Sequence, residues 1–350
     1  MPEIAELDPG AHEALFRVSD AASGLLAFIA IHSTRLGPAA GGLRMRRYAD
    51  EPTAITDVLR LSEGMTYKNA AADLPLGGGK AVIIGDPRKD KSPGLLRAFG
   101  EAVQSFAGRY WTAEDMGMTT GDMATIAGAT EFVAGLPDGV YASGDPSPVT
   151  ALGVLNGIRV ALRHKTGRES LAGRRVAVQG LGSVGRHLCG LLREAGADLL
   201  VSDVDRARVA EAVGSLGANA VAPECIAEVP ADILAPCAIG GTLTAETIGR
   251  LTAQVVAGAA NNQLPSAAEA EFLHARGTLY APDFIVNGGG IINVAAEICR
   301  IGDRPAWVNG KLAALSETLD VVLAAAADAK TSPHRIAMDV VSRKLGSVRG

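Results

Sequence analysis

Hydrophobic residues recur along the first part of the chain with the spacings of both strands and helices. Residues 15–34 predict two strands joined by a turn, because Asp20, Ser23 and Gly24 supply turn conformations between two apolar runs. From Glu51 to about Ala72 the apolar side chains follow helical spacing. The other predicted elements are a strand at 80–87, a helix at 92–106, a strand ending at Glu114-Asp115, and a short helix and strand within 121–135.

Beyond residue 150 the pattern becomes more regular, with strands and helices in alternation. A loop-like segment from Tyr141 to Thr150 precedes a long helix from Ala151 to about His164. Strand, helix and strand then follow in an order that implies a parallel sheet with right-handed crossovers. The chain from Ile291 onward is alanine-rich and predicted to be helical. The remaining predicted strands lie within 175–179, 198–203, 231–238, 253–260 and 277–287, and the remaining helices at 187–196, 244–251 and 267–274.

These patterns predict an α/β protein with two domains. A chain of 350 residues is long enough for two ordinary cores. The first domain is expected at residues 1–140 and the second at 141–325, with the boundary in the loop-like segment. A C-terminal helix from about 326 to 350 is expected to pack back on the first domain.

Composition excludes several classes of protein. Hydrophobic residues make up 48% of the chain and charged residues 20%, which is typical of a folded globular protein. The net charge of −5 and the lack of a long basic run argue against a nucleic-acid partner. Arg44, Arg46 and Arg47 form only a short cluster, which we interpret as a solvated or interface face.

The cysteines and the chain start indicate a reducing compartment. The four cysteines show no metal-ligand spacing and no adjacent histidine, so we expect free buried thiols and no metal site. The first residues lack the basic and apolar regions of a signal peptide. No apolar run approaches the ~20 residues that span a bilayer. We therefore expect a cytoplasmic protein without a membrane partner. The cysteines are Cys189, Cys225, Cys237 and Cys299.

A glycine-rich turn in the second domain indicates dinucleotide binding. Gly180, Gly182 and Gly185 form G-x-G-x-x-G between a predicted strand and helix, and Asp203 follows Gly185 by 18 residues at the end of the next strand. This context is typical of a doubly wound Rossmann unit, in which the glycines let the pyrophosphate approach the helix N-terminus. A purely structural turn is the alternative. A carboxylate at Asp203 would bond the ribose diol and so favours NAD over NADP, although the nearby arginines weaken that preference.

Two lysines in the first domain lie in unusually apolar surroundings. Lys68 follows Met65 on the predicted helix, and Lys80 stands between three glycines and the run Ala81 to Ile84. A buried ammonium needs an anion or loses its proton, so one lysine is a candidate for gripping an anion and the other for proton chemistry. The alternative is a pair of surface lysines with only their stems buried.

Several motifs together resemble one enzyme family. The chain is similar, from its N-terminal hairpin to about Glu297, to the glutamate/leucine/phenylalanine/valine dehydrogenases, and most closely to the leucine and phenylalanine members. Such a resemblance implies a substrate domain and an NAD-binding domain that flank a cleft, and a homo-oligomer. The motifs are LGPAAGG, MTYKNAAA, LGGGKAVIIGDPRKDKSP, TAEDMG, VAVQGLG, APCAIGG, GAANNQL and YAPDFIVNGGG.

The resemblance also assigns roles within the first domain. It implies that Lys68 binds the substrate carboxylate, that Lys80 performs the proton chemistry, and that Asp115 completes a proton relay near the amino group. A turn or helix cap is the alternative for Asp115. Lys80 is expected to be neutral because burial and a second cation, Lys68, lower its pKa. Gly41 and Gly42, which could also form an ordinary tight loop, would lie close to the substrate.

Cofactor and side-chain contacts are implied in the same way. Asn262 would lie near both the substrate and the cofactor, and Thr150 beside the nicotinamide. The implied cofactor-binding set is Gly180, Leu181, Gly182, Ser183, Val184, Gly185, Asp203, Thr150, Cys237, Ala238, Asn261 and Asn262. The implied side-chain pocket is Ala40, Ala113, Ala134, Ile291 and Val294.

The implied pocket carries no charge, which favours an apolar amino acid and disfavours glutamate. We therefore expect NAD-dependent oxidative deamination of leucine, valine or isoleucine. Ala40 and Ala134 are smaller than expected of leucine enzymes, so phenylalanine is the alternative substrate, since a methylene changes discrimination by only ~1–3 kcal/mol. A catalytically idle NAD-binding regulatory protein is a third hypothesis. Gly288 and Asp145 also depart from the alanine and asparagine expected of the family.

Overall fold

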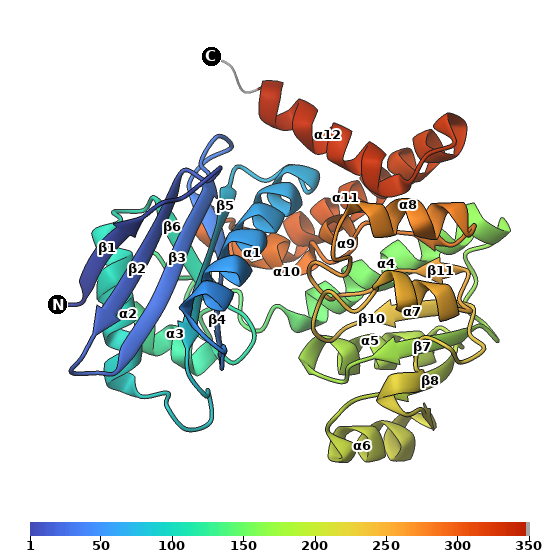
Figure 1. Cartoon of the computed structure of the whole chain (residues 1–350), viewed down its shortest axis with the longest axis horizontal. Coiled ribbons are helices and arrows are strands. Elements are labelled where there is room, and N and C mark those ends of the chain that lie inside the picture. The colour runs from blue at the N-terminus through green and yellow to red at the C-terminus, as the bar shows by residue number, and fades with distance from the viewer. Residues whose placement is uncertain (348–350) are drawn as a thin grey trace. The chain divides into compact units, whose positions relative to one another are not determined.

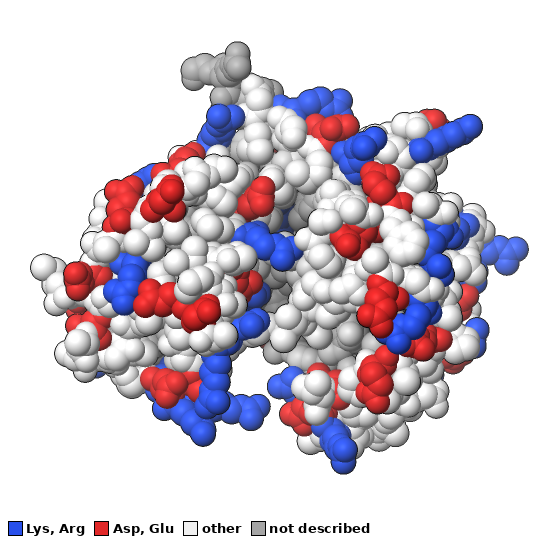
Figure 2. Space-filling view, viewed as in Figure 1, with Lys and Arg blue, Asp and Glu red and all other residues white. Residues whose placement is uncertain are grey.

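The computed structural model describes residues 1–347 and divides into two compact units. Among the described residues, unit 1 comprises residues 1–146, 291–309 and 344–347, and unit 2 comprises residues 147–290 and 310–343. Figure 1 shows a sheet with helices packed on it in each unit. Helices among the described residues are all too short or too polar to span a membrane. On the face drawn in Figure 2, Lys and Arg are scattered among Asp and Glu on both units.

Unit 1 is built on a six-stranded mixed sheet with helices on both faces. The strand order is β1-β2-β3-β5-β4-β6, in which β1, β2, β3 and β5 pair antiparallel, and β4 pairs parallel to β5 and β6. The predicted hairpin is confirmed as β2 and β3. The strands are β1 (Glu3–Leu7), β2 (Ala14–Asp20), β3 (Leu25–Ser33), β4 (Ala39–Arg46), β5 (Gly77–Ile84) and β6 (Tyr110–Glu114).

Alternating side chains give the sheet of unit 1 two separate cores. On one face, Phe28 and Ala30 of β3 pack with Val58 and Leu61 of α1 (Glu51–Ala71). On the opposite face, Ile29 and other residues of the sheet pack against α2 (Pro93–Ser105) and α3 (Thr120–Ala127). The period of two along each strand explains why neighbouring residues enter different cores. The predicted helices within 51–72 and 92–106 are confirmed, and the side chain of Ser92 caps α2.

Two predictions for unit 1 are wrong in detail. The tight loop given as the alternative for Gly41 and Gly42 is wrong, because both lie on the buried strand β4, whose neighbours on both sides supply backbone partners that sequence alone does not reveal. The strand expected near residue 133 is reduced to one bridge, between Thr112 and Val133.

Unit 2 contains an entirely parallel six-stranded sheet, which confirms the predicted α/β class. The order is β12-β11-β10-β7-β8-β9, with the glycine motif between β7 and α5. Its strands are β7 (Arg175–Gln179), β8 (Asp198–Ser202), β9 (Asn219–Ala220), β10 (Ile233–Pro236), β11 (Val255–Val256) and β12 (Leu279–Tyr280). Its helices include α4 (Ser147–Thr166), α5 (Ser183–Glu194), α6 (Arg206–Leu216), α7 (Ala245–Arg250), α8 (Ala267–Ala275) and α9 (Asp283–Val286).

Some boundaries in unit 2 differ from the prediction. The helix expected from Ala151 begins at Ser147, inside the segment interpreted as a loop, because Pro148 suits the first turn of a helix. The strand expected within 277–287 stops at Tyr280 and gives way to α9. Pro282 explains that end, since it cannot donate to a strand ladder. The short strand β9 was not predicted.

The C-terminal part forms three helices. They are α10 (Gly289–Ile298), α11 (Arg304–Ala329) and α12 (Pro333–Ser347). Near the end of α12, Lys344 Nζ donates to the carbonyl of Ala70 in α1 at 3.0 Å, and both residues belong to unit 1. The last three residues of the predicted C-terminal helix lie outside the described residues.

Candidate active site

Lys80 lies in the middle of the sheet of unit 1 and is 3% exposed. It follows three glycines that begin β5. A Cβ at Gly78 would lie 2.0 Å from Thr66 Oγ1 of α1, and a Cβ at Gly79 would lie 2.7 Å from the Tyr110 ring. The glycines therefore let a helix and an aromatic ring pack directly against the strand, which removes water from around Lys80.

Lys68 is also buried. It lies in the last turn of α1 and is 8% exposed. This burial rules out a pair of surface lysines with only their stems covered. The two lysines come from adjacent elements of the same unit, α1 and β5.

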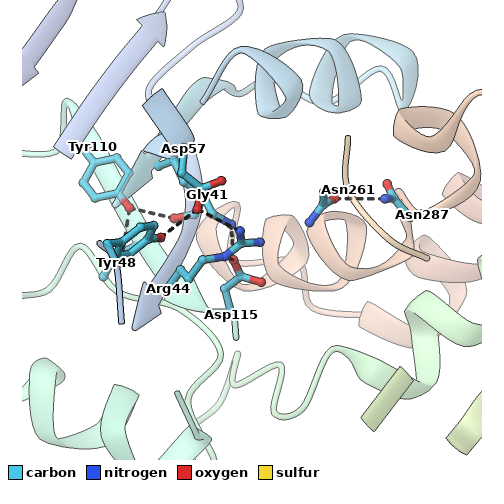
Figure 3. Close-up of polar contacts among 10 residues, drawn as sticks. Gly41, Arg44, Tyr48, Asp57, Tyr110, Asp115, Asn261 and Asn287 are labelled. Atoms are coloured by element: carbon cyan, nitrogen blue, oxygen red, sulfur yellow. Dashed lines mark hydrogen bonds and ion pairs between the residues drawn. The ribbon is translucent and has the colours of Figure 1, made fainter. Parts of the chain in front are cut away.

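Asp115 follows the end of β6 and pairs with two cations. Lys80 Nζ lies 2.6 Å from Asp115 Oδ2, and Arg44 Nε lies 3.3 Å from the same oxygen (Figure 3 shows Arg44 and Asp115). Among the described residues, no side-chain donor contacts Oδ1. One carboxylate oxygen therefore contacts both cations.

The charges in this cluster perturb one another. Burial lowers the pKa of Lys80, and the positive charge of Arg44 lowers it further, while Asp115 opposes both effects. Burial alone would raise the pKa of Asp115, but Lys80 and Arg44 hold it well below its usual range. Asp115 is therefore an anion at neutral pH and a weak base. Lys80 is a lysine that loses its proton more easily than an exposed one.

Arg44 is the residue that sequence reasoning missed. The sequence places it in a short cluster interpreted as a solvated or interface face, and the second cation expected to act on Lys80 is Lys68. Arg44 is only 7% exposed, and it also binds Asp57 of α1 through Nη1 at 3.1 Å. The available signal was its position between Leu43 and Met45, a charged residue inside a buried apolar run.

Gly41 and Gly42, which are expected to lie close to the substrate, belong to β4 and allow Gly79 and Asp115 to approach the strand closely. A Cβ at Gly42 would lie 2.7 Å from the Cβ of Asp115, and a Cβ at Gly41 would lie 1.9 Å from the carbonyl oxygen of Gly79. Tyr110 Oη donates to the carbonyl of Gly41 at 2.9 Å. Any larger residue at position 42 would displace Asp115 from the cluster.

The five positions of the implied side-chain pocket all belong to unit 1 and are buried. Ala40 lies on β4 and Ala113 on β6, and Ala134 donates its N–H to the carbonyl of Thr112 at 2.9 Å. Ile291 and Val294 lie three residues apart on α10.

Glu297 continues the spacing of Ile291 and Val294 along α10, and sequence reasoning did not single it out. Its Oε2 accepts hydrogen bonds from Gly135 N at 2.8 Å, Ser143 N at 2.9 Å and Ser143 Oγ at 2.6 Å. The carboxylate thus ties α10 to the segment that begins at Ala134.

The glycine motif of unit 2 has the geometry of an anion cradle. Gly180 has φ of +97°, and a Cβ there would lie 2.8 Å from the Cβ of Ala238. A Cβ at Gly185 would lie 2.0 Å from the carbonyl oxygen of Gly180, whereas one at Gly182 would meet open space. No side chain of the described residues caps the N-terminus of α5, where Ser183 and Val184 form the first turn. Its backbone N–H groups can therefore receive an anionic ligand.

Asp203 is engaged with this loop. Its Oδ2 accepts from Leu181 N at 2.6 Å, and its Oδ1 accepts from Asp205 N at 2.8 Å. The side chain is 8% exposed, and the guanidinium of Arg208 lies 3.9 Å from Oδ2. A carboxylate offers about four lone-pair positions, so these bonds leave acceptor capacity for a ribose hydroxyl.

Other implied cofactor contacts lie on neighbouring turns of unit 2. Thr150 is in the first turn of α4 and is 9% exposed. Asn287 Nδ2 donates to Asn261 Oδ1 at 3.0 Å (Figure 3). Asn262 has a left-handed φ of +50°, and its carbonyl accepts from Gly241 N. The loop that carries Cys237 and Ala238 is therefore hydrogen-bonded to Asn262 through Gly241.

The cysteines are free, as predicted, but not all are buried. Cys225 is exposed, and Cys237 and Cys299 are partly buried. Burial raises the pKa of Cys189 and of Cys237 to about 12, which keeps both thiols protonated at neutral pH. A search of the described residues finds no group of three His, Cys, Asp or Glu side chains that could hold a metal ion.

Comparison with known proteins agrees with this geometry. Residues 12–132 match the family model described as Glu/Leu/Phe/Val dehydrogenase, dimerisation domain, and residues 202–332 match the model described as Glutamate/Leucine/Phenylalanine/Valine dehydrogenase. The chain is 52% identical to leucine dehydrogenase of Bacillus subtilis over 82% of its length and 79% of the relative's. It is 46% identical to phenylalanine dehydrogenase of Caldalkalibacillus thermarum over 95% of its length and 91% of the relative's.

A solved structure supports the same assignment. The crystal structure of L-tryptophan dehydrogenase from Nostoc punctiforme matches with a TM-score of 0.76 and 38% identity, over 97% of both chains. Fold, site and relatives together define the class of protein: an amino-acid dehydrogenase, an oxidoreductase that acts on a CH–NH2 group. The chain belongs to the glutamate/leucine/phenylalanine/valine dehydrogenase family.

Proposed function

We propose that the chain catalyses the reversible NAD-dependent oxidative deamination of an apolar L-amino acid, with leucine, valine and isoleucine as its substrates. The products are the 2-oxo acid, ammonia and NADH. The observation that carries the proposal is the ion pair between the buried Lys80 and the partly buried Asp115, 2.6 Å apart, in a chain 52% identical to a leucine dehydrogenase. Unit 1 would bind the amino acid and unit 2 the dinucleotide.

The residues of unit 2 fit a dinucleotide. The open space above Gly182 and the uncapped N-terminus of α5 suit a pyrophosphate. Asp203 would accept from the ribose hydroxyls and disfavour a 2′-phosphate, which supports NAD over NADP. When bound, NAD supplies the acceptor for the hydride that leaves the α-carbon of the substrate.

Three side chains of unit 1 would divide the remaining chemistry. Lys68 would stay charged and bind the substrate carboxylate. Neutral Lys80 would accept a proton from the water that attacks the substrate iminium, and the hydroxyl of that water would add to the α-carbon. Lys80 would then return this proton to the nitrogen and take up the proton of the hydroxyl, so that ammonia leaves as the carbonyl forms. The low pKa of Asp115 makes it a poor proton acceptor, so we assign it the task of stabilising positive charge at the nitrogen.

An aliphatic substrate is favoured by the buried, uncharged positions Ala40, Ala113, Ala134, Ile291 and Val294. A glutamate side chain would bring a second carboxylate without a partner at these positions. Phenylalanine is the second candidate, because Ala40 and Ala134 are small and a phenylalanine dehydrogenase matches over 95% of the chain. We also propose a cytoplasmic homo-oligomer, supported by the family model's description of residues 12–132 as a dimerisation domain.

The decisive assay is NADH formation at alkaline pH with leucine, valine, isoleucine, phenylalanine, tryptophan and glutamate, each with NAD and with NADP. We expect the highest kcat/KM with a branched-chain substrate and NAD. A preference for phenylalanine would refute the aliphatic substrate and support the alternative, a phenylalanine dehydrogenase. No turnover with any amino acid would refute it.

Lys80→Ala tests the division of labour between the units. We expect turnover to fall by at least ~10³-fold, because the variant lacks the base, while NADH affinity measured by fluorescence stays unchanged. A large loss of NADH affinity would contradict the separate roles.

Asp203→Ala tests the ribose contact. We expect weaker binding of NADH, since the variant loses both the proposed ribose acceptor and the bond to Leu181 N. Unchanged affinity would show that Asp203 is misassigned.

A further inference from the structure

Arg44 bridges the carboxylates of Asp57 and Asp115, and Asp115 also pairs with Lys80. It lies on β4, contacts Asp115 beyond the end of β6 through Nε, and contacts Asp57 on α1 through Nη1. Figure 3 shows the guanidinium beside both carboxylates. Its side chain is only 8% exposed, so water screens these contacts little. Three elements of unit 1 therefore meet at one buried cation.

Arg44 and Lys80 share one oxygen of Asp115, so the role of Arg44 depends on the charge of Lys80. Both cations contact Asp115 Oδ2. When Lys80 is neutral, Asp115 would be a partly buried anion with neither of its two contacting cations charged and present if Arg44 were absent, and it would then compete with Lys80 for the proton. An arginine does not lose its proton in a protein, so Arg44 supplies a constant positive charge through every protonation state of Lys80.

We propose that Arg44 is a positioning residue of the reaction, a permanent cation that holds Asp115 as a fixed anion while Lys80 gains and loses its proton. This inference rests on the proposed function for its catalytic meaning. Arg44 itself touches neither substrate nor cofactor in this scheme; it acts through Asp115 and through its charge at Lys80.

Asp57 moderates that charge from the opposite side. Its Oδ2 accepts from Arg44 and, at 2.7 Å, from the hydroxyl of Tyr48. The charge of Asp57 raises the pKa of Lys80, whereas that of Arg44 lowers it. Other charged or titratable groups also lie on the elements that contact β5. They are Glu51, Arg60, Glu63, Tyr67 and Lys68 on α1, His32 on β3, Arg46 on β4, and Tyr110 and Glu114 on β6.

Substitution of Arg44 and substitution of Asp57 should therefore shift the pKa of Lys80 in opposite directions. Residues that only stabilised the local structure would not produce opposite shifts. Removing Arg44 should raise the pKa of Lys80. Neutralising Asp57 should lower it, because Arg44 then acts without its counterion. Asparagine keeps an oxygen that can accept from Arg44 and Tyr48, so Asp57→Asn preserves the hydrogen bonds while it removes the charge.

The test measures Lys80 directly by competitive acetylation with acetic anhydride, across pH, followed by peptide mass spectrometry of the full chain without substrate or cofactor. We expect the midpoint for Lys80 labelling to rise by about one pH unit in Arg44→Met, which corresponds to a tenfold fall in the labelling rate at a fixed lower pH. In Asp57→Asn we expect the midpoint to fall. Arg17→Met, which breaks the half-buried pair with Glu51, is the matched control and should leave the midpoint unchanged.

Kinetics gives the second readout. Lys80 must be neutral to accept a proton, so the acidic limb of kcat/KM against pH should move upward in Arg44→Met and downward in Asp57→Asn, by the same amounts as the labelling midpoints. If Arg44→Met does not fold, Arg44→Lys keeps a cation that can reach only one carboxylate, and we expect a smaller upward shift.

Unchanged midpoints in the Arg44 variants, or shifts of the same sign in the Arg44 and Asp57 variants, would overturn the inference. Failure of the proposed function is distinguishable, because it would appear as absent turnover by the unaltered enzyme. Labelling needs no turnover and would still decide whether Arg44 controls Lys80.

Discussion

Replacement of Glu297 by alanine should destabilise unit 1 more than any surface change. The carboxylate is 8% exposed and accepts three hydrogen bonds through one oxygen. Alanine would leave the buried N–H groups of Gly135 and Ser143 without an acceptor, at a cost of about 1–3 kcal/mol each. The Ser143 hydroxyl can rotate to another partner, so we expect a total loss of about 4 kcal/mol.

Glu297→Gln is the matched variant. Glutamine retains an acceptor oxygen of the same reach, so the backbone donors keep their partner and only the charge assistance is lost. We expect a loss of about 1 kcal/mol for this variant, within the range of one ordinary hydrogen bond.

Urea unfolding followed by tryptophan fluorescence measures this difference. The chain has two tryptophans, Trp111 and Trp307, and both belong to unit 1, so the signal follows that unit. With a slope of about 2 kcal/mol per M, the alanine variant should unfold at a midpoint about 2 M lower, and the glutamine variant about 0.5 M lower. An unchanged midpoint for alanine, or equal losses for both variants, would refute the reasoning.

The remaining predictions concern the two sites separately. Gly185→Ala should weaken NADH binding at least tenfold, because its Cβ would lie 2.0 Å from a carbonyl oxygen; Gly190→Ala on the same helix meets no atom within 4 Å and should bind normally. Titration calorimetry distinguishes them, and equal affinities would contradict the cradle. Burial, followed by the charges of Asp145, Asp122 and Asp115, raises the pKa of Glu114 to about 7. Its protonation stabilises the fold at acidic pH, and that contribution is lost as pH rises through about 7. Asp145→Asn should therefore reduce the fall in Tm between pH 5 and pH 8, and an unchanged fall would exclude this charge effect.

Local patterns were sufficient for most elements of the fold. The helix at 51–72, the hairpin within 15–34 and the alternating strands and helices of unit 2 follow from the spacing of apolar residues and from turn chemistry, which act over a few positions. The strand β4 was missed because its glycines carry no strand signal, and its pairing depends on β5 and β6, far along the chain. Strand pairing is a property of distant neighbours, and sequence spacing does not encode it locally.

The candidate site divides in the same way. The sequence by itself determined which residues have the required chemistry: the lysines among apolar neighbours, the carboxylate after β6 and the glycine motif between strand and helix. Only the tertiary structure decided which charges act on one another. It brought Arg44 of β4 into contact with Asp115 Oδ2 and with Asp57 of α1. It also gave Glu297 hydrogen-bond donors that lie 154 and 162 residues away in the sequence. The physical reason is that electrostatic and hydrogen-bond energies depend on distance in space and on burial, and neither is set before the chain has folded.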